Sequence, residues 1–369
     1  MLDSLLDNYE EIRKIDKSNM LSFQVKAAEH YNKALSVVEK FSVDFPKPEN
    51  VIIAGMGGSA IGGELVKDWA RNRAPAPIEV CRDYALPKYA GARTLVLVSS
   101  YSGETEESLS AFLDANRRGA MICCVSSGGK LLEFAEKCGV PFVRVPSGMP
   151  PRVALPYLFI PLLELLERSG FISGFSEEFQ EANKVLEKVA NDNGPDSALK
   201  SNPAKTLATG INNSVPVVYG FGLYRSVAQR IKQQFNENSK VPSKWEYFPE
   251  LDHNEVVGWE KRGSFTKHFS SIFLREKNEP SEVRSRIEIT KALMAPVISK
   301  QFEVWSQGKS DLAKMLSTIL VGDFTSVYLA VLRGVDPTPV ETITTLKKKL
   351  DDVGTKARVI RELEKLSKT

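Results

Sequence analysis

The sequence predicts an α/β protein of two domains, each built on a mainly parallel sheet. The chain has 369 residues, which is longer than one hydrophobic core usually serves. Short apolar runs rich in β-branched residues alternate with amphipathic stretches, a pattern typical of βαβ units. The alternation runs twice, on either side of a connector at 171–179. We therefore expect an N-terminal domain over 1–175 and a C-terminal domain over 176–369.

The first round of alternation contains five expected strands, enough for one compact sheet. NVIIAG (50–55) and RTLVLVSS (93–100) are short apolar runs that end at glycine or serine, as buried parallel strands do. ETEESLSAFLDANRRG (104–119) instead carries apolar residues at helical spacing. The acidic stretch 1–14 is also helix-like. Strands are expected at 50–55, 77–82, 93–100, 120–126 and 141–146, and helices at 21–41, 60–73, 104–119, 129–139 and 152–170.

The second round begins after a helical stretch at 184–193 and a break at Pro195. VPVVYGFG (215–222) has the same strand-then-glycine character as the first strand of the first round. The chain ends in two helical segments, 338–350 and 356–366. Between these, strands are expected at 215–222, 244–249, 269–276 and 295–305, and helices at 224–238, 281–293 and 311–334.

The composition excludes several classes of protein. With 42% hydrophobic and 26% charged residues, the chain is an ordinary globular one. Its 49 basic and 46 acidic residues balance too closely to indicate nucleic acid or an anionic membrane as the main partner. The four cysteines form no CxxC pair, and no leader-like or membrane-spanning segment is present, so we expect a cytoplasmic protein with free thiols.

A first candidate binding loop follows the strand at 50–55. GMGGSAIGG (55–63) places Gly57, Gly58 and Ser59 where a strand turns into a helix, and the helix N-terminus there offers unpaired N–H groups to an anion. The loop lacks the GK[ST] ending of a P-loop. It does fit a dinucleotide fingerprint, with Asp83 at a suitable distance, so this loop alone leaves nucleotide binding open.

A second loop favours a terminal phosphate over a dinucleotide. Ser100, Ser102 and Thr105 follow the third strand and stand at the start of the next helix. In a sheet of order 2-1-3-4-5, strands 1 and 3 are neighbours, and ligands bind at the crevice between their carboxyl ends. Hydroxyls and helix amides from both loops then face one small volume. Ser102 or Thr105 taken alone would more often be a simple helix cap.

At this point the sequence resembles a known family. GMGGSAIGG (55–63) and SSYSGETEE (99–107) are similar to the sugar isomerase (SIS) domain, and the whole chain resembles the bifunctional phosphoglucose/phosphomannose isomerases of archaea and some bacteria. The resemblance implies two flavodoxin-like, three-layer α/β/α SIS domains. It also implies a sugar-phosphate substrate and interconversion of glucose 6-phosphate or mannose 6-phosphate with fructose 6-phosphate through a cis-enediol, without metal or cofactor.

The resemblance also implies which residues do the proton chemistry. Glu237 lies in FNENSK (235–240), similar to the family motif that contains the glutamate base, although a glutamate at a helix end is ordinarily only solvated. Arg152 matches the family's PR-x-ALP motif, whose arginine stabilises the enediolate. The positive end of the helix dipole disfavours an arginine at a helix start, so another interaction must favour Arg152 at this position. An interdomain salt bridge is the alternative explanation.

His253 in PELDHNE (249–255) corresponds to the family histidine that assists ring opening and comes from the neighbouring subunit, which implies a homodimer. Lys347 corresponds to the lysine that acts with this histidine, although TLKKKL (345–350) would equally suit a surface run. The family's threonine near the active site has no clear counterpart around 339–342. No set of His, Cys and carboxylate residues has metal-ligand spacing, so no metal site is expected.

Two alternatives remain open. One is another SIS-domain enzyme that acts on a sugar phosphate. The other is a non-catalytic regulator that senses a sugar phosphate, although the chain has no segment with the charge and spacing of a helix-turn-helix.

Overall fold

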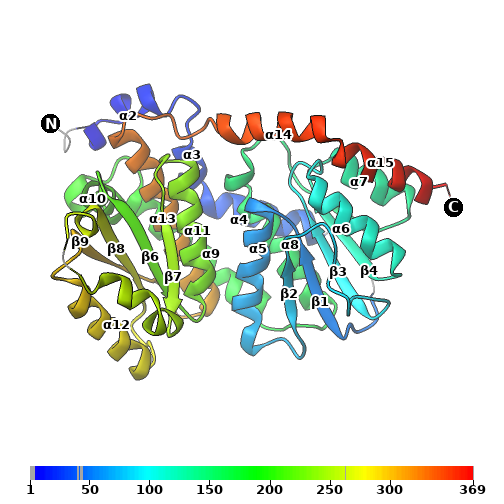
Figure 1. The fold of residues 1–369 in the computed structure, drawn as a ribbon, viewed down its shortest axis with the longest axis horizontal. Coiled ribbons are helices and arrows are strands. Elements are labelled where there is room, and N and C mark those ends of the chain that lie inside the picture. The colour runs from blue at the N-terminus through cyan, green and yellow to red at the C-terminus, as the bar shows by residue number, and fades with distance from the viewer. Residues whose placement is uncertain (1–4, 40, 42–44, 262, 369) are drawn as a thin grey trace. The chain divides into compact units, whose positions relative to one another are not determined.

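The computed structural model describes residues 5–39, 41, 45–261 and 263–368 (Figure 1). The first residues of the expected N-terminal helix, 1–4, and residue 40 of the expected helix 21–41 lie outside them. The chain forms two compact units. Unit 1 contains the N-terminal residues up to Ala28 and then Glu177–Pro339, and unit 2 contains Glu29–Ser176 and the residues from Val340 onward.

Unit 2 is built on a five-stranded parallel sheet of order β2-β1-β3-β4-β5, as predicted. Val51 in the second position of β1 pairs with Ile78 on one side and Leu95 on the other, so β1 and β3 are direct neighbours. The strands are β1 (Asn50–Ala54), β2 (Ile78–Cys81), β3 (Thr94–Ser99), β4 (Met121–Ser126) and β5 (Phe142–Arg144).

Helices cover both faces of this sheet. On one face of the sheet, Ile52 lies in a core that also contains residues of α6 (Glu106–Arg117) and α15 (Thr355–Leu366). On the opposite face, Gly63 of α5 (Gly57–Trp69) packs so closely on Ile53 that a Cβ there would lie 2.8 Å from its side chain. The remaining helices of this unit are α4 (Ala27–Glu39, which begins in unit 1), α7 (Gly129–Lys137), α8 (Leu155–Arg168) and α14 (Glu341–Val353).

Unit 1 contains a second parallel sheet, of order β7-β6-β8-β9. Together the two sheets confirm the predicted α/β class. The expected strand at 295–305 is shorter, because Ala295 and Val297 still donate to carbonyls of the preceding helix. The strands are β6 (Val215–Phe221), β7 (Lys244–Phe248), β8 (Phe269–Arg275) and β9 (Lys300–Trp305). The helices are α2 (Tyr9–Ile15), α3 (Leu21–Val25), α9 (Phe175–Asn193), α10 (Pro203–Ile211), α11 (Tyr224–Glu237), α12 (Ser281–Met294) and α13 (Asp311–Leu332).

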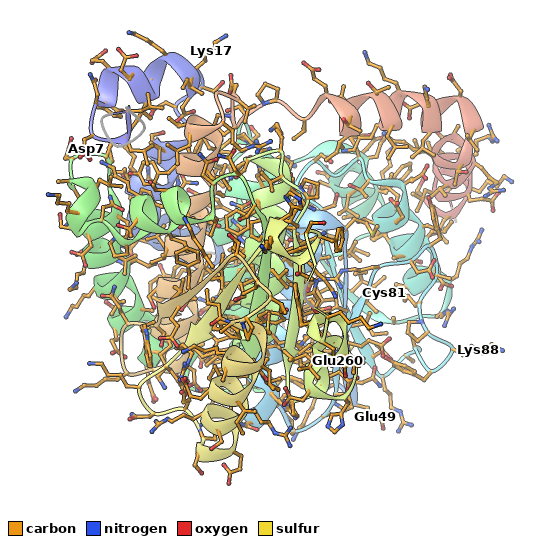
Figure 2. The ribbon with its side chains drawn as sticks, turned by 60° about the vertical axis from the view of Figure 1, so that its left-hand side comes forward. Asp7, Lys17, Glu49, Cys81, Lys88 and Glu260 are labelled. Carbon is orange, nitrogen blue, oxygen red and sulfur yellow. The ribbon has the colours of Figure 1, made fainter. Side chains whose placement is uncertain are left out.

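The units differ from the predicted domains 1–175 and 176–369 at both ends of the chain. Val359 and Leu363 of α15 are buried in the core of unit 2. In unit 1, the carboxylate of Asp7, which is labelled in Figure 2, accepts a hydrogen bond from Leu199 N at 2.7 Å and pairs with the fully buried Lys205 at 3.2 Å. The N-terminal residues therefore belong to unit 1, although most of unit 1 comes later in the sequence. The C-terminal residues belong to unit 2, although most of unit 2 comes earlier.

Helix α13 is the centre of unit 1 and packs against α10 and α11. Among the described residues it is the one helix long and apolar enough to cross a membrane, and its apolar stretch is wholly buried inside the folded chain. Arg230 of α11 and Asp323 of α13 form a buried ion pair at 2.8 Å. Burial raises the pKa of Asp323, and the charge of Arg230 opposes this effect.

Helix α9 is tied to the start of α13 through Glu181. Its carboxylate accepts hydrogen bonds from Lys309 N at 2.7 Å and Ser310 N at 2.9 Å. Burial alone would raise the pKa of Glu181, but the hydrogen bonds from Ser310 and Lys309 outweigh it and lower the pKa below its ordinary value.

We expect Glu181→Gln to reduce the free energy of unfolding by about 1–2 kcal/mol at pH 7, because one acceptor and the negative charge are lost. A lowered folded-state pKa means that this stabilisation is complete above the ordinary value of 4.5 and is lost as the pH falls through the lowered one. Denaturant titration at several pH values measures both. Glu187→Gln, at an exposed position of the same helix, is the control and should change little. A difference between wild type and Glu181→Gln that does not shrink at all as the pH falls below 4.5 would contradict the assignment.

Candidate functional site

The first predicted loop shapes the amino end of α5. The helix begins at Gly57, three residues earlier than expected, and its N-cap Met56 is extended and makes no side-chain capping bond. Gly57 adopts φ +52°, and a Cβ at Gly55 would lie 2.7 Å from the carbonyl oxygen of Ser99. The turn therefore requires glycine at position 57, and the close contact with the end of β3 requires glycine at position 55. The first N–H groups of α5 remain available to a ligand.

The second predicted loop shapes the amino end of α6. Thr105 is the N-cap, in an extended conformation without a side-chain capping bond. Ser100 Oγ donates to Thr105 Oγ1 at 3.2 Å, and Ser102 Oγ accepts from Glu104 N at 3.2 Å. The two loops are in contact, because Tyr101 N of the second loop donates to Ser59 Oγ of the first loop at 3.2 Å.

The structure thus brings together the six residues predicted to bind phosphate. Ser59 and Ser100 are buried at the base of the cradle, whereas Gly57 and Ser102 are exposed and form its rim. Two uncapped helix N-termini place partial positive charge at one edge of the sheet. Hydroxyls and backbone N–H groups at this edge can hold a compact anion such as a phosphate monoester. The six residues are Gly57, Gly58, Ser59, Ser100, Ser102 and Thr105.

A third loop, residues 126–129 between β4 and α7, was not predicted. A Cβ at Gly103 would lie 1.9 Å from Gly128 O, and one at Gly129 would lie 2.4 Å from Ser102 O. Glu104 accepts from the N–H of Lys130 at 2.9 Å. The third loop therefore packs closely against residues 102–104 of the second loop. Its Ser-Ser-Gly-Gly sequence after a strand resembles the other two loops in character and could have revealed it.

Two further predicted residues belong to the same unit. Arg152 lies in a 3₁₀ turn, Pro151–Val153, just ahead of α8, rather than in the helix itself, and is 2% exposed. A Cβ at Gly58 would lie 3.0 Å from Pro151 O, so the backbone beside Arg152 packs on the first loop. Lys347 is exposed on α14, a helix with no buried residue.

Glu237 belongs to unit 1 and is the last residue of α11, where it is partly buried. The residues after it hold the helix end in place: Asn238 Nδ2 donates to Ser326 Oγ at 2.9 Å, and Ser239 Oγ donates to Ser326 O at 2.6 Å. Lys240 Nζ donates to the carbonyl oxygen of Glu237 at 2.5 Å. The backbone of Glu237 is thereby fixed from two sides.

His253, also in unit 1, is exposed at the end of a 3₁₀ turn, Glu250–His253. Its neighbour Asp252 anchors this turn to α12, accepting from Arg286 at 2.8 Å and from Thr290 Oγ1 at 3.1 Å. His253 is therefore held at the surface by a fixed backbone.

The corresponding strand ends of the second sheet are filled by protein. Tyr224 OH, just after β6, donates to Glu276 Oε2 at 3.1 Å and accepts from Ser306 Oγ at 2.8 Å. Lys314 pairs with Glu276 at 2.8 Å. A carboxylate thus stands beyond β8, where the first sheet has hydroxyls beyond β3.

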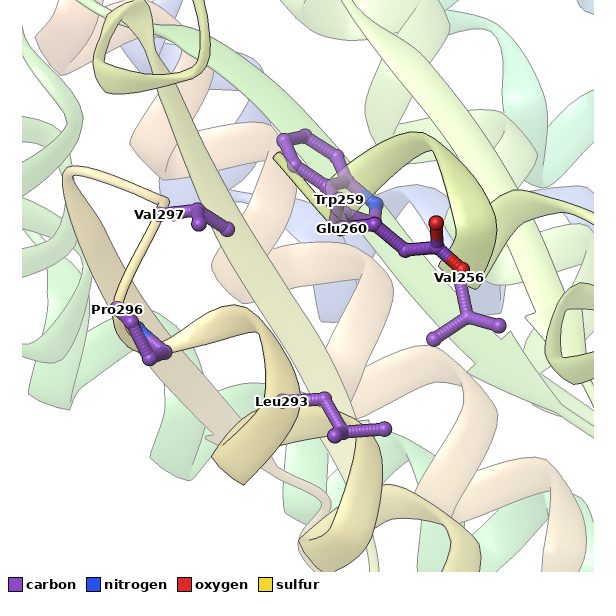
Figure 3. Close-up of a pocket in the computed structure, with 6 residues that line it drawn as sticks. All are labelled: Val256, Trp259, Glu260, Leu293, Pro296 and Val297. Carbon is purple, nitrogen blue, oxygen red and sulfur yellow. The ribbon is translucent and has the colours of Figure 1, made fainter. Parts of the chain in front are cut away.

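A pocket of about 430 Å³ lies elsewhere in unit 1, between the 3₁₀ turn Glu255–Trp259 and the end of α12 (Figure 3). Its lining is mostly apolar and contains none of the predicted site residues. It is formed by Val256, Trp259, Glu260, Leu293, Pro296 and Val297. Among the described residues, no group of three or more His, Cys, Asp or Glu side chains is placed to hold a metal ion.

Comparisons with known proteins agree with this geometry. Residues 200–350 match a family model described as the bacterial phospho-glucose isomerase C-terminal SIS domain. A Caldicellulosiruptor bescii protein named bifunctional phosphoglucose/phosphomannose isomerase is 41% identical over 328 residues, which cover 88% of this chain and 97% of that protein. An Aquifex aeolicus protein of the same name is 34% identical over 313 residues, covering 85% and 93%.

Solved structures share the fold. The C-terminal domain of glucosamine-fructose-6-phosphate aminotransferase from Francisella tularensis superposes with a TM-score of 0.66 at 15% identity, covering 87% of this chain and 98% of that one. At that identity the likeness concerns the fold alone. With the SIS family match, it confirms the predicted pair of SIS-type units.

We expect Gly103→Ala to weaken binding of inorganic phosphate at least tenfold, because the added Cβ forces the second and third loops apart. Gly119→Ala is a matched control: Gly119 has φ +65°, against +66° at Gly103, but no atom lies within 4 Å of its Cβ position. Both variants carry the same backbone strain. Calorimetric titration with phosphate should separate them, and equal affinities would contradict the assignment of the cradle.

Proposed function

Because the chain belongs to the family of bifunctional phosphoglucose/phosphomannose isomerases, we propose that it interconverts glucose 6-phosphate and mannose 6-phosphate with fructose 6-phosphate. The observation that carries this proposal is the cradle at the amino ends of α5 and α6. A sugar phosphate offers it one compact dianion, and the sugar extends beyond the rim.

In this proposal the phosphate oxygens accept hydrogen bonds from the N–H groups of Gly57 and Gly58 and from the hydroxyls of Ser59, Ser100, Ser102 and Thr105. This binding energy holds the open-chain sugar in one orientation while the reaction takes place at its other end. It serves both epimers equally, since they differ at C2 and share the 6-phosphate.

Isomerisation moves one proton between two adjacent carbons. We assign Glu237 as the base that removes the proton from C2 of the aldose and returns it to C1, leaving a cis-enediol between the two steps. Negative charge develops on the enediol oxygens, and the guanidinium of Arg152 would stabilise it. This route needs no redox cofactor, because hydrogen is only redistributed within the substrate. It also requires no metal when a cation from the protein supports the enediolate.

Ring opening precedes this proton transfer. We assign it to His253 and Lys347, with His253 supplied by the second subunit of a homodimer. Rotation about the C2–C3 bond of the open-chain enediol would present either face of C2 to the same base and so serve both epimers. We also assign the protein to the cytoplasm, in keeping with its balanced charge and its free cysteines.

We expect Glu237→Gln to lower kcat for both aldose phosphates by at least a thousandfold, because the amide cannot accept the C2 proton. Phosphate-ester binding should remain near the wild-type level. A coupled assay measures turnover, and calorimetry with a non-isomerisable sugar phosphate measures binding. Glu187→Gln is the control. Undiminished turnover would exclude Glu237 as the base, whereas a wild-type protein that binds sugar phosphates without turnover would favour the sensing regulator.

Exchange of His253 between subunits can be tested with a mixed dimer. A heterodimer of one Glu237→Gln chain and one His253→Ala chain contains one intact site if His253 crosses the interface, and should keep about half the wild-type activity. Both homodimers should be almost inactive. Two affinity tags on co-expressed chains allow the heterodimer to be purified. An inactive heterodimer would show that each His253 serves its own chain.

A further inference from the structure

Tyr101 stands in the middle of the second loop but is buried, with 6% of its surface exposed. Its hydroxyl donates to Pro146 O at 3.0 Å and accepts from Met149 N at 3.0 Å. One hydroxyl therefore closes the segment 146–149 by binding both of its ends. This segment connects the region of β5 with the turn that contains Arg152.

The backbone of Tyr101 has a separate set of partners. Its N–H donates to Ser59 Oγ at 3.2 Å, in the first loop. Its carbonyl oxygen accepts from Ser127 N at 3.0 Å and from Ser127 Oγ at 2.7 Å, in the third loop. The main chain of Tyr101 thus joins the three loops of the cradle, while its side chain binds a segment outside them.

The segment held by the hydroxyl leads directly to Arg152. Met149 is followed by Pro150 and Pro151, which have no N–H and a restricted φ. Met149 N is therefore the last backbone donor before Arg152. The two prolines form a stiff link, and the turn closes with Val153 N donating to Pro150 O at 3.0 Å. A shift at Met149 would be passed on to Arg152.

Burial raises the pKa of Tyr101, and the hydrogen bond from Met149 only partly opposes this effect. The hydroxyl consequently keeps its proton, and its bond to Pro146 O, throughout the neutral pH range.

We propose that the Tyr101 hydroxyl is a positioning group that fixes Arg152 relative to the phosphate cradle. This inference rests on the proposed function, in which Arg152 supports the enediolate. It assigns two separate tasks to one residue: the main chain assembles the anion site, and the side chain orients the cation that acts at the far end of the substrate.

Tyr101→Phe separates these tasks, because it removes the hydroxyl and leaves the ring and the main-chain bonds. We expect kcat for fructose 6-phosphate formation to fall about tenfold, while KM and the affinity for inorganic phosphate stay within about twofold. Tyr89→Phe is the matched control: its exposed hydroxyl binds Glu79 at 2.5 Å in the same unit, and kcat should not change.

Ser127→Ala tests the other task of the same residue. It removes the 2.7 Å bond from the Ser127 hydroxyl to the Tyr101 carbonyl oxygen. The Tyr101 hydroxyl stays bonded to Pro146 O and Met149 N. We expect KM and the dissociation constant for phosphate to rise about threefold, with kcat within about twofold of wild type. A fall in kcat with Ser127→Ala as large as that with Tyr101→Phe would contradict the separation.

A double-mutant cycle decides whether Tyr101 acts through Arg152. In the background of Arg152→Lys, which is itself slower, Tyr101→Phe should lower kcat by less than about twofold. A further tenfold loss would overturn the proposal, as would a parallel loss of phosphate affinity in Tyr101→Phe alone. An inactive wild-type protein would instead refute the proposed isomerase function and leave the phosphate-binding measurements to be judged separately.

Discussion

Two helices, α5 and α6, begin side by side without a side-chain cap, and the sheet order obliges them to do so. In a parallel sheet all strands point the same way, so the helices that follow β1 and β3 start at one edge. Uncapped N–H groups would be a cost if that edge were filled by protein. Here glycines at 55, 57 and 58 keep side chains away from it. The third loop and the main chain of Tyr101 hold the first two loops together at this edge.

Much of the fold could be predicted because its signals are local. Strands β1, β3 and β4 are nearly continuous apolar runs, and each strand of unit 2 ends close to the residue expected. Helix α10 was missed, although Asn202 followed by Pro203 is a helix-start signal and Asn202 does cap the helix. The location of the chain ends could not be inferred, since the burial of Leu363 and the pairing of Asp7 with Lys205 depend on residues far away in sequence.

The cradle was predictable for the same reason, because glycine and hydroxyl residues follow strands at positions where the topology makes them meet. Tyr101 could not be found in this way. Nothing in the sequence distinguishes an exposed loop tyrosine from one whose hydroxyl reaches residues 146–149, a contact 45 to 48 positions away. The roles proposed for Glu237, His253, Arg152 and Lys347 come from resemblance, since a carboxylate, an imidazole or a cationic side chain has no chemical signature of its own in a sequence.

The discontinuity of the two units has a consequence for any attempt to divide the protein. A gene fragment that ends after residue 176 would encode the whole sheet of unit 2 but would lack α15. The side of α6 that α15 now covers, in a core that includes Val359 and Leu363, would then face water. Such a fragment would tend to aggregate. To express this unit separately, one would instead have to splice the C-terminal segment from residue 340 onto Glu29–Ser176 through a new linker, a rearrangement related to circular permutation.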